Sequence, residues 1–450
     1  MKKFLNLIIL AVMVAACSSE EPMPMPDNSA QQQGSVKVTV EEAIKIANQA
    51  AEAFDAKSAR GVSRRASSAA MVDVLGAKNG RSGGIDTLLY MVNYDNKQGY
   101  AIVSASHACE TLLGIVDEGE FNALEAAENP SYSYYLANAQ NYVVSTLGAT
   151  WGGGTGGKLP AFTEFKRYVY DVIPNRLTVE WGEKYPEGMY CPNKLAGSAQ
   201  VAMAQIMSYL EAPNSINLTY SDCDAPGVME LNWTALKMHK RSINSYDLDS
   251  INMHVADCEV SNLVHDTLAR LCRQLGELNL AEYHEDGSWW CTNAFSDDVL
   301  ARFQALLPEK EFIPLSELEA DIDYELLYEH IQNGIGYMAG IDVTNYPNVT
   351  SHAWVIDGAV HSGEIITRYW NDLTIGGQQH TTVTDLTNYY FHFNWCYGGD
   401  NNGYFLAGVL NPSESTIPAG SVKNNNPHLV LSRTGYDTLV RYFIVKDESD

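Results

Sequence analysis

The chain has 450 residues, of which 46% are hydrophobic and 10% aromatic, so it can bury a sizeable core and is not globally disordered. Its 55 acidic and 29 basic side chains give a formal charge of −26, which argues against nucleic-acid binding through phosphate neutralisation. The length favours two folded units of unequal size.

The N-terminus predicts export. Two lysines precede an apolar run and then small residues up to Cys17. The segment Val14–Cys17 resembles the lipobox of bacterial lipoproteins, which implies a signal peptide over residues 1–17 and lipidation of Cys17. We therefore expect an exported protein, lipid-anchored to the bacterial outer membrane or cell surface, with residues 18–34 as a flexible tether. A signal peptide with an incidental cysteine is the alternative.

Residues 35–150 predict a compact α+β unit. Thr39 and Glu42 have the spacing of a capping box that opens an amphipathic helix. Two apolar runs around a polar turn then predict a β-hairpin. The expected elements are a helix with Ile44, Ala47, Ala51 and Phe54 on one face, strands over 88–94, 100–106 and 112–116, and a helix over 130–147.

A glycine-rich segment, residues 151–165, is predicted to be a flexible linker to a second unit, residues 166–450. The segment 199–210 is apolar all round and predicts a central helix, and amphipathic helices are expected at 260–278 and 297–307. Toward the C-terminus, apolar runs separated by Gly, Asn and Pro predict an antiparallel sheet. This order indicates an α+β domain with a helix-rich half, a sheet half and a cleft between them.

Three stretches could carry chemistry. Ser198 would start the buried helix, where the dipole and free N–H groups favour negative charge. His352 precedes a predicted strand more than a hundred residues downstream, and Asn394 and Trp395 precede a glycine-rich turn. The chain order nucleophile, His, Asn is that of papain-like peptidases. Each residue alone has an ordinary structural use, Ser198 as a helix N-cap, but their joint occurrence favours a catalytic site.

These stretches resemble the motifs of the streptopain family of cysteine peptidases, which have a papain-like fold. The nucleophile helix G-C-V-A-T-A-x-A-Q-I-M, the G-H-A-x-V-I-D-G motif and the H-x-N-W-G-W-G-G motif are matched by residues 197–207, 351–358 and 392–399. The first unit resembles the family's pro-region. The resemblance implies that His352 is the catalytic base, Asn394 its orienter and Trp395 the indole that shields and positions the imidazole.

Two positions depart from the family's pattern. Ser198 stands at the nucleophilic cysteine, and Glu183 at the glutamine of the oxyanion hole. A cysteine becomes a thiolate beside an imidazolium, whereas a serine needs His352 to take its proton during attack. An ionised Glu183 would present an acceptor where donors are needed, and losing one donor costs on the order of a hundred- to a thousandfold in rate. A mutation made to trap an inactive zymogen would replace the nucleophile and would not require a change to Glu183. The presence of both departures therefore favours natural divergence of the sequence.

We therefore expect an exported streptopain-family peptidase homologue, with a small α+β pro-domain and a papain-like domain, that is catalytically degenerate. The alternatives are a pseudopeptidase that binds peptides or an inhibitor, an active enzyme with a serine nucleophile, and a pro-domain that inhibits active relatives in trans. The expected partners are a protein or peptide substrate in the cleft, the chain's own pro-domain, and a membrane through the lipid anchor. No cofactor is expected, and the absence of H-E-x-x-H and of close Cys/His clusters predicts no metal site.

Overall fold

The computed structural model describes residues 37–56, 63–67, 72–75, 87–107, 109–152, 162–244, 251, 262–283, 289–290, 297–314, 323–342, 350–371, 379–410 and 440–446. The predicted signal peptide, the lipidation site Cys17 and the predicted tether lie outside the described residues. Within the ranges just given, no helix combines the length and the apolar character that a membrane span requires.

The N-terminal unit contains the elements that its sequence predicts. The predicted elements are α2 (Val40–Asp55), β2 (Leu89–Asn93), β3 (Tyr100–Ser104), β4 (Leu112–Val116) and α4 (Pro130–Gly152). Three elements were not predicted: β1 (Val72–Leu75), η1 (Asp95–Lys97) and α3 (Ala123–Glu128). The predicted capping box is present, because the Thr39 hydroxyl accepts the N–H of Glu42 at 3.2 Å and the Glu42 carboxylate accepts the N–H of Thr39 at 2.8 Å. β2 and β3 form the predicted hairpin, and β4 pairs with β3.

The predicted linker, residues 151–165, is corrected at both ends. Helix α4 continues to Gly152, and strand β5 (Phe162–Ile173) begins ahead of the predicted boundary. β5 is rich in aromatic residues, which favour strands, and it pairs antiparallel with β12 (Thr350–Asn371). Only residues 153–161 of the predicted linker lie outside the described residues.

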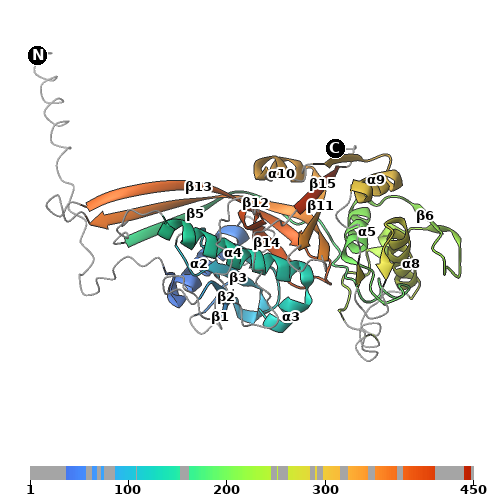
Figure 1. Ribbon diagram of the computed structural model, residues 1–450, viewed down its shortest axis with the longest axis horizontal. Coiled ribbons are helices and arrows are strands. Elements are labelled where there is room, and N and C mark those ends of the chain that lie inside the picture. The colour runs from blue at the N-terminus through green and yellow to red at the C-terminus, as the bar shows by residue number, and fades with distance from the viewer. Residues whose placement is uncertain are drawn as a thin grey trace, which may run out of the picture.

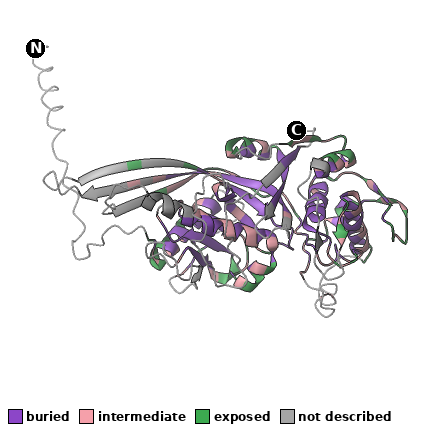
Figure 2. Cartoon of the chain, viewed as in Figure 1, coloured by how far each residue is buried: buried purple, intermediate pink, exposed green. Residues whose placement is uncertain are grey.

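The second unit has helices at one end and a sheet at the other (Figure 1). Its further elements are α5 (Ser198–Leu210), β6 (Ser215–Leu218), β7 (Gly227–Glu230), α6 (Trp233–Leu236), α8 (Asn262–Leu278), β8 (Glu282–Tyr283), β9 (Trp289–Trp290), α9 (Asp297–Leu306), β10 (Glu311–Pro314), α10 (Tyr324–Ile331), β11 (Gly334–Asp342), β13 (Gln379–Asn394), β14 (Gly403–Leu406), η2 (Ala407–Leu410) and β15 (Val440–Lys446). Helix α5 is buried along its length apart from Tyr209, which confirms the predicted central helix (Figure 2).

Among the described residues, both units contribute to one 11-stranded sheet. Its path runs β1-β2-β3-β4-β14-β13-β12-β11-β15-β10, and β5 pairs with β12 off this path. At the junction, β4 and β14 pair antiparallel, with Val116 opposite Gly403 and Gly114 opposite Phe405. The sequence predicts two successive α+β units; the fold class is as predicted, but the units are joined by a shared sheet.

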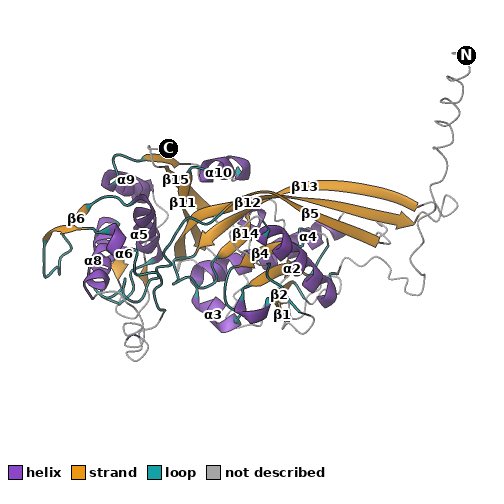
Figure 3. Ribbon diagram, turned by 180° about the vertical axis from the view of Figure 1, so that it is seen from behind, coloured by secondary structure: helices purple, strands orange, loops and turns teal. Residues whose placement is uncertain are grey.

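Strands β5, β12 and β13 extend away from the helix-rich end as a three-stranded arm (Figure 3). The sequence predicts two strands, over 353–360 and 364–372, where the structure has the single strand β12. Gly363 therefore does not mark a turn. A Cβ at this position would lie 2.5 Å from the Tyr170 hydroxyl on β5, so the glycine permits the close approach of the neighbouring strand.

Two hydrophobic cores pack on opposite faces of the central sheet. Alternate residues of β12 belong to different cores: Trp354 and Ile356 to one, Ala353 and Val355 to the other. The first core also contains most of the buried apolar residues of the N-terminal unit, and the second contains the apolar residues of α5. The start of α5 therefore lies against the face of β12 opposite to the one that the N-terminal unit covers.

Candidate active site

Ser198 is the first residue of α5, where the sequence places the nucleophile. The residue is 1% exposed, and its Oγ accepts the backbone N–H of Ala353 at 3.1 Å. Gly197, before it, has a φ of 89°, a conformation that glycine adopts without the steric cost of a Cβ. Because Ala353 follows His352, the structure brings Ser198 to the strand that carries the predicted base.

His352 lies on β12, opposite Gly340 of β11, and is partly exposed. The backbone at Gly340 is closely covered. A Cβ there would lie 3.2 Å from the Trp354 ring and 3.3 Å from the ring of Tyr134. Since Tyr134 belongs to α4, the N-terminal unit covers the strand pair beside the predicted base.

The side-chain amide of Asn394 is hydrogen-bonded to residues on and beside α5. Its oxygen accepts from Gln205 Nε2 at 3.2 Å and from the N–H of Cys396 at 3.1 Å. Its nitrogen donates to Gln205 Oε1 at 3.0 Å and to the carbonyl oxygen of Val179 at 3.3 Å. These contacts give the amide a structural use, and its role as orienter of His352 stays a prediction.

Trp395 lies in the first core and is 1% exposed. Its Nε1 donates to the carbonyl oxygen of Asn401 at 2.9 Å. Its ring centroid lies 6.0 Å from that of Tyr132 on α4 and 5.0 Å from that of Phe405 on β14. The indole therefore joins the N-terminal unit to the sheet, and its role beside the imidazole also stays a prediction.

Gln205 is a buried residue of this region to which the sequence motifs assigned no role. It lies about two turns after Ser198 and is fully buried. Besides its two bonds with Asn394, Oε1 accepts the N–H of Trp181 and Nε2 donates to Cys396 Sγ, both at 3.2 Å. The sequence carries one signal of this role, because Gln205 is a polar residue in a helix that is predicted to be buried. A buried amide requires hydrogen-bond partners, so such a glutamine is expected to bind neighbouring polar groups.

Glu183 lies beside the entry to α5, since its carbonyl oxygen accepts the N–H of Ala196 at 2.7 Å. The residue is 4% exposed, and burial raises the pKa of its carboxyl to about 8, against a lowering effect of Lys184. The loss of activity expected from the sequence assumes an ionised carboxylate. At pH 7 the buried carboxyl is protonated, so it can donate a hydrogen bond; above pH 8 it becomes an acceptor.

The same segment holds a second buried acid, Glu187, which the sequence analysis did not single out. It is fully buried and accepts a hydrogen bond from the Ser242 hydroxyl, and His239 Nε2 lies 3.8 Å from its carboxylate. Burial raises the pKa of Glu187 to about 8. Two neutral carboxyls therefore lie in one short segment at neutral pH.

Cys396 is the cysteine nearest to these motif residues, and it occupies a glycine position of the family motif. Its φ of 61° lies in the left-handed region that favours glycine. The residue is fully buried, and burial raises the pKa of its thiol well above the usual value. A thiol in this state is not a replacement for the missing nucleophilic cysteine.

The sheet half, the central helix that begins at Ser198 and the N-terminal unit packed over the strands form an α+β fold of two units that share one sheet. The chain belongs to the Peptidase C10 family, whose model matches residues 178–405, just over half of the chain. Residues 35–143 match the model of the Spi protease inhibitor. The predicted streptopain-family membership and pro-region are thereby confirmed.

One solved structure similar to this chain is a mutant fragment of prointerpain A from Prevotella intermedia. The two are 15% identical, the match covers 84% of this chain and 98% of that chain, and the TM-score is 0.48. No curated protein matches the chain.

Proposed function

We propose that this protein is a catalytically degenerate Peptidase C10 homologue that retains its pro-domain. The observation that carries the proposal is Ser198, a buried hydroxyl whose oxygen already accepts the N–H of Ala353. A thiol at the start of a helix, beside an imidazolium, ionises and attacks as the thiolate. A hydroxyl gains no such standing charge, so its attack depends on simultaneous proton transfer to His352.

The reaction open to this scaffold is peptide-bond hydrolysis. Ser198 Oγ would attack the carbonyl carbon while His352 takes the hydroxyl proton, and water would then resolve the acyl-enzyme. Neutral Glu183 could donate to the oxyanion, whereas the amide of Asn394 is held by Gln205. We therefore place the main loss of activity at the nucleophile.

Covalent labelling tests this proposal. The full chain receives a protease site between Gly152 and Phe162 and is opened there, which removes the covalent connection between the pro-domain and the peptidase domain. A fluorophosphonate probe is then expected to label the natural chain no more than Ser198→Ala. Labelling that disappears in Ser198→Ala would support the serine-nucleophile alternative instead. Peptide binding without turnover would identify the binding pseudopeptidase.

We also propose export and lipid anchoring through Cys17, supported by the lipobox-like sequence that precedes it. In a bacterial host, the natural precursor is expected to partition into the detergent phase of Triton X-114, and Cys17→Ala into the aqueous phase. Mass spectrometry of the N-terminal peptide should show a lipid on Cys17. Equal partitioning of both chains into the detergent phase would contradict anchoring at this residue.

A further inference from the structure

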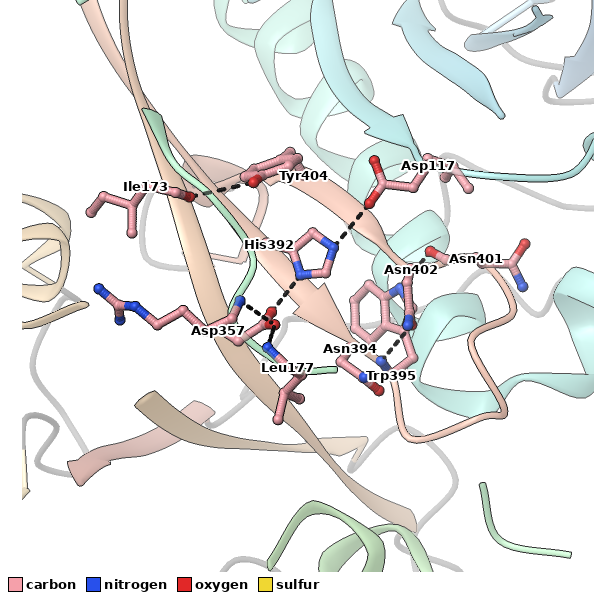
Figure 4. A network of polar contacts seen from close by, with 12 residues as sticks. Asp117, Ile173, Leu177, Asp357, His392, Asn394, Trp395, Asn401, Asn402 and Tyr404 are labelled. Carbon is pink, nitrogen blue, oxygen red and sulfur yellow. Dashed lines mark hydrogen bonds and ion pairs between the residues drawn. The ribbon is translucent and has the colours of Figure 1, made fainter. Parts of the chain in front are cut away.

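His392 lies where the pro-domain meets the peptidase sheet, between two carboxylates (Figure 4). Its Nδ1 is hydrogen-bonded to Asp357 Oδ1, and its Nε2 lies 3.1 Å from Asp117 Oδ2. Asp357 and His392 belong to β12 and β13, whereas Asp117 directly follows β4 of the pro-domain. The N–H of Asp117 also donates to the carbonyl oxygen of Asn402 at 2.9 Å, beside the pairing of β4 with β14.

On the peptidase side, His392 is 2% exposed and faces acidic groups. Asp357 is fully buried, and its second oxygen accepts the N–H groups of Arg176 at 3.1 Å and Leu177 at 2.8 Å. The carboxylate is therefore held in place independently of the imidazole. Burial raises the pKa of Glu180, and the charges of Arg241 and, to a smaller extent, His392 act against that rise.

On the pro-domain side, one cation stands behind Asp117. Arg64 Nη1 lies 3.7 Å from Asp117 Oδ1, while its Nη2 pairs with Asp55 at 2.8 Å. From β14, the ring of Tyr404 lies 5.0 Å from the imidazole, centroid to centroid. Arg64 lies nearer to Asp55 than to Asp117, and of the two cationic side chains beside Asp117, His392 is the nearer, at 3.1 Å.

This arrangement requires a cationic imidazole. Both ring nitrogens face carboxylates, and only the protonated ring can donate from both. Burial alone lowers the pKa of His392, but Asp357 and Asp117 outweigh it and raise the pKa to about 10. A neutral ring could donate to only one of the two carboxylates and would lose its positive charge between them, so both ion pairs would weaken.

We propose that Asp117, His392 and Asp357 form a proton-dependent latch that fastens the pro-domain to the peptidase sheet. Since the pKa of His392 is raised above its ordinary 6.5, the latch contributes fully below about pH 6.5 and is lost as the pH rises through about 10. The latch lies at the β4–β14 junction, so its loss should open this junction before the rest of the sheet.

Amide hydrogen exchange of the full chain at pH 7 tests whether the latch stabilises the pairing of β4 with β14. We expect Asp117→Asn and His392→Gln each to lower the protection of β4 and β14 by at least about tenfold. The double variant should lose no more than the larger single loss, because both changes remove one interaction. Equal protection in the natural chain and Asp117→Asn would overturn the latch.

Two controls separate the latch from general destabilisation. Glu120→Gln removes a carboxylate of the same pro-domain segment. Glu120 forms an exposed ion pair with Lys97 at 3.8 Å, so this change should leave the amide protection of β4 and β14 unchanged. Helix α5 serves as the internal reference, and its protection should stay constant in all variants. A loss in α5 equal to that in β4 and β14 would also overturn the proposal.

An NMR titration tests whether the His392 imidazole is protonated. The imidazole signal of His392 is assigned by its disappearance in His392→Gln. In the natural chain the ring should stay protonated at pH 8, and Asp117→Asn should lower its titration midpoint by at least about one pH unit. A midpoint near 6.5 in the natural chain, or one that Asp117→Asn does not move, would contradict the proposal.

Discussion

Replacing Ser198 by cysteine is expected to give casein hydrolysis at pH 7, at least about a hundredfold above that of the natural chain. The thiol would ionise beside His352 and the start of α5, which removes the need for proton transfer during attack. At this pH Glu183 is protonated, so it does not oppose the oxyanion. The measurement is release of fluorescent peptides from labelled casein, with chains opened between Gly152 and Phe162.

The same variant should lose activity as the pH rises through about 8. The family resemblance assigns Glu183 to the oxyanion hole, where its ionised carboxylate would present an acceptor to the oxyanion, at an expected cost on the order of a hundred- to a thousandfold. Ser198→Cys/Glu183→Gln should keep its activity at pH 9. Adding Glu187→Gln instead is the matched control, because that buried acid has a similarly raised pKa and the alkaline loss should persist.

Two results would contradict this account of the site. A flat activity profile of Ser198→Cys from pH 7 to pH 9 would show that Glu183 does not face the oxyanion. Silence of Ser198→Cys/Glu183→Gln at every pH would show that the scaffold has lost more than its nucleophile and one donor.

The second large effect concerns stability. We expect Gln205→Leu to lower the free energy of unfolding by about 2–5 kcal/mol, because the N–H of Trp181 and the amide of Asn394 would lose buried partners. Urea unfolding measures the change. Gln304→Leu makes the same replacement at an exposed position of α9 and should alter stability by less than about 0.5 kcal/mol. Equal midpoints for the two variants would contradict the structural role of Gln205.

Local signals predicted much of the secondary structure. The capping box at Thr39 and the all-apolar helix α5 are encoded within a few residues, and both are present. The union of the two units was not predicted, because periodicity identifies a strand but not the edge along which it pairs. β4 and β14 lie almost 300 residues apart in the chain. For the same reason His392 carried no sign of its partner Asp117.

The candidate site was predictable in part. The motif order placed Ser198 next to the strand of His352, as the structure has it. Asn394 makes hydrogen bonds that its motif does not reveal, because they depend on how α5 packs against the sheet. The protonation of Glu183 depends on burial, which the residue type alone does not specify.

The most direct test of catalytic degeneracy is turnover by the natural sequence. Casein hydrolysis is compared at pH 7 between the opened natural chain and Ser198→Ala, with Ser198→Cys/Glu183→Gln as the positive control. We predict that the natural chain and Ser198→Ala are indistinguishable while the control is active. Hydrolysis by the natural chain that Ser198→Ala abolishes would contradict degeneracy and make this a serine-dependent peptidase.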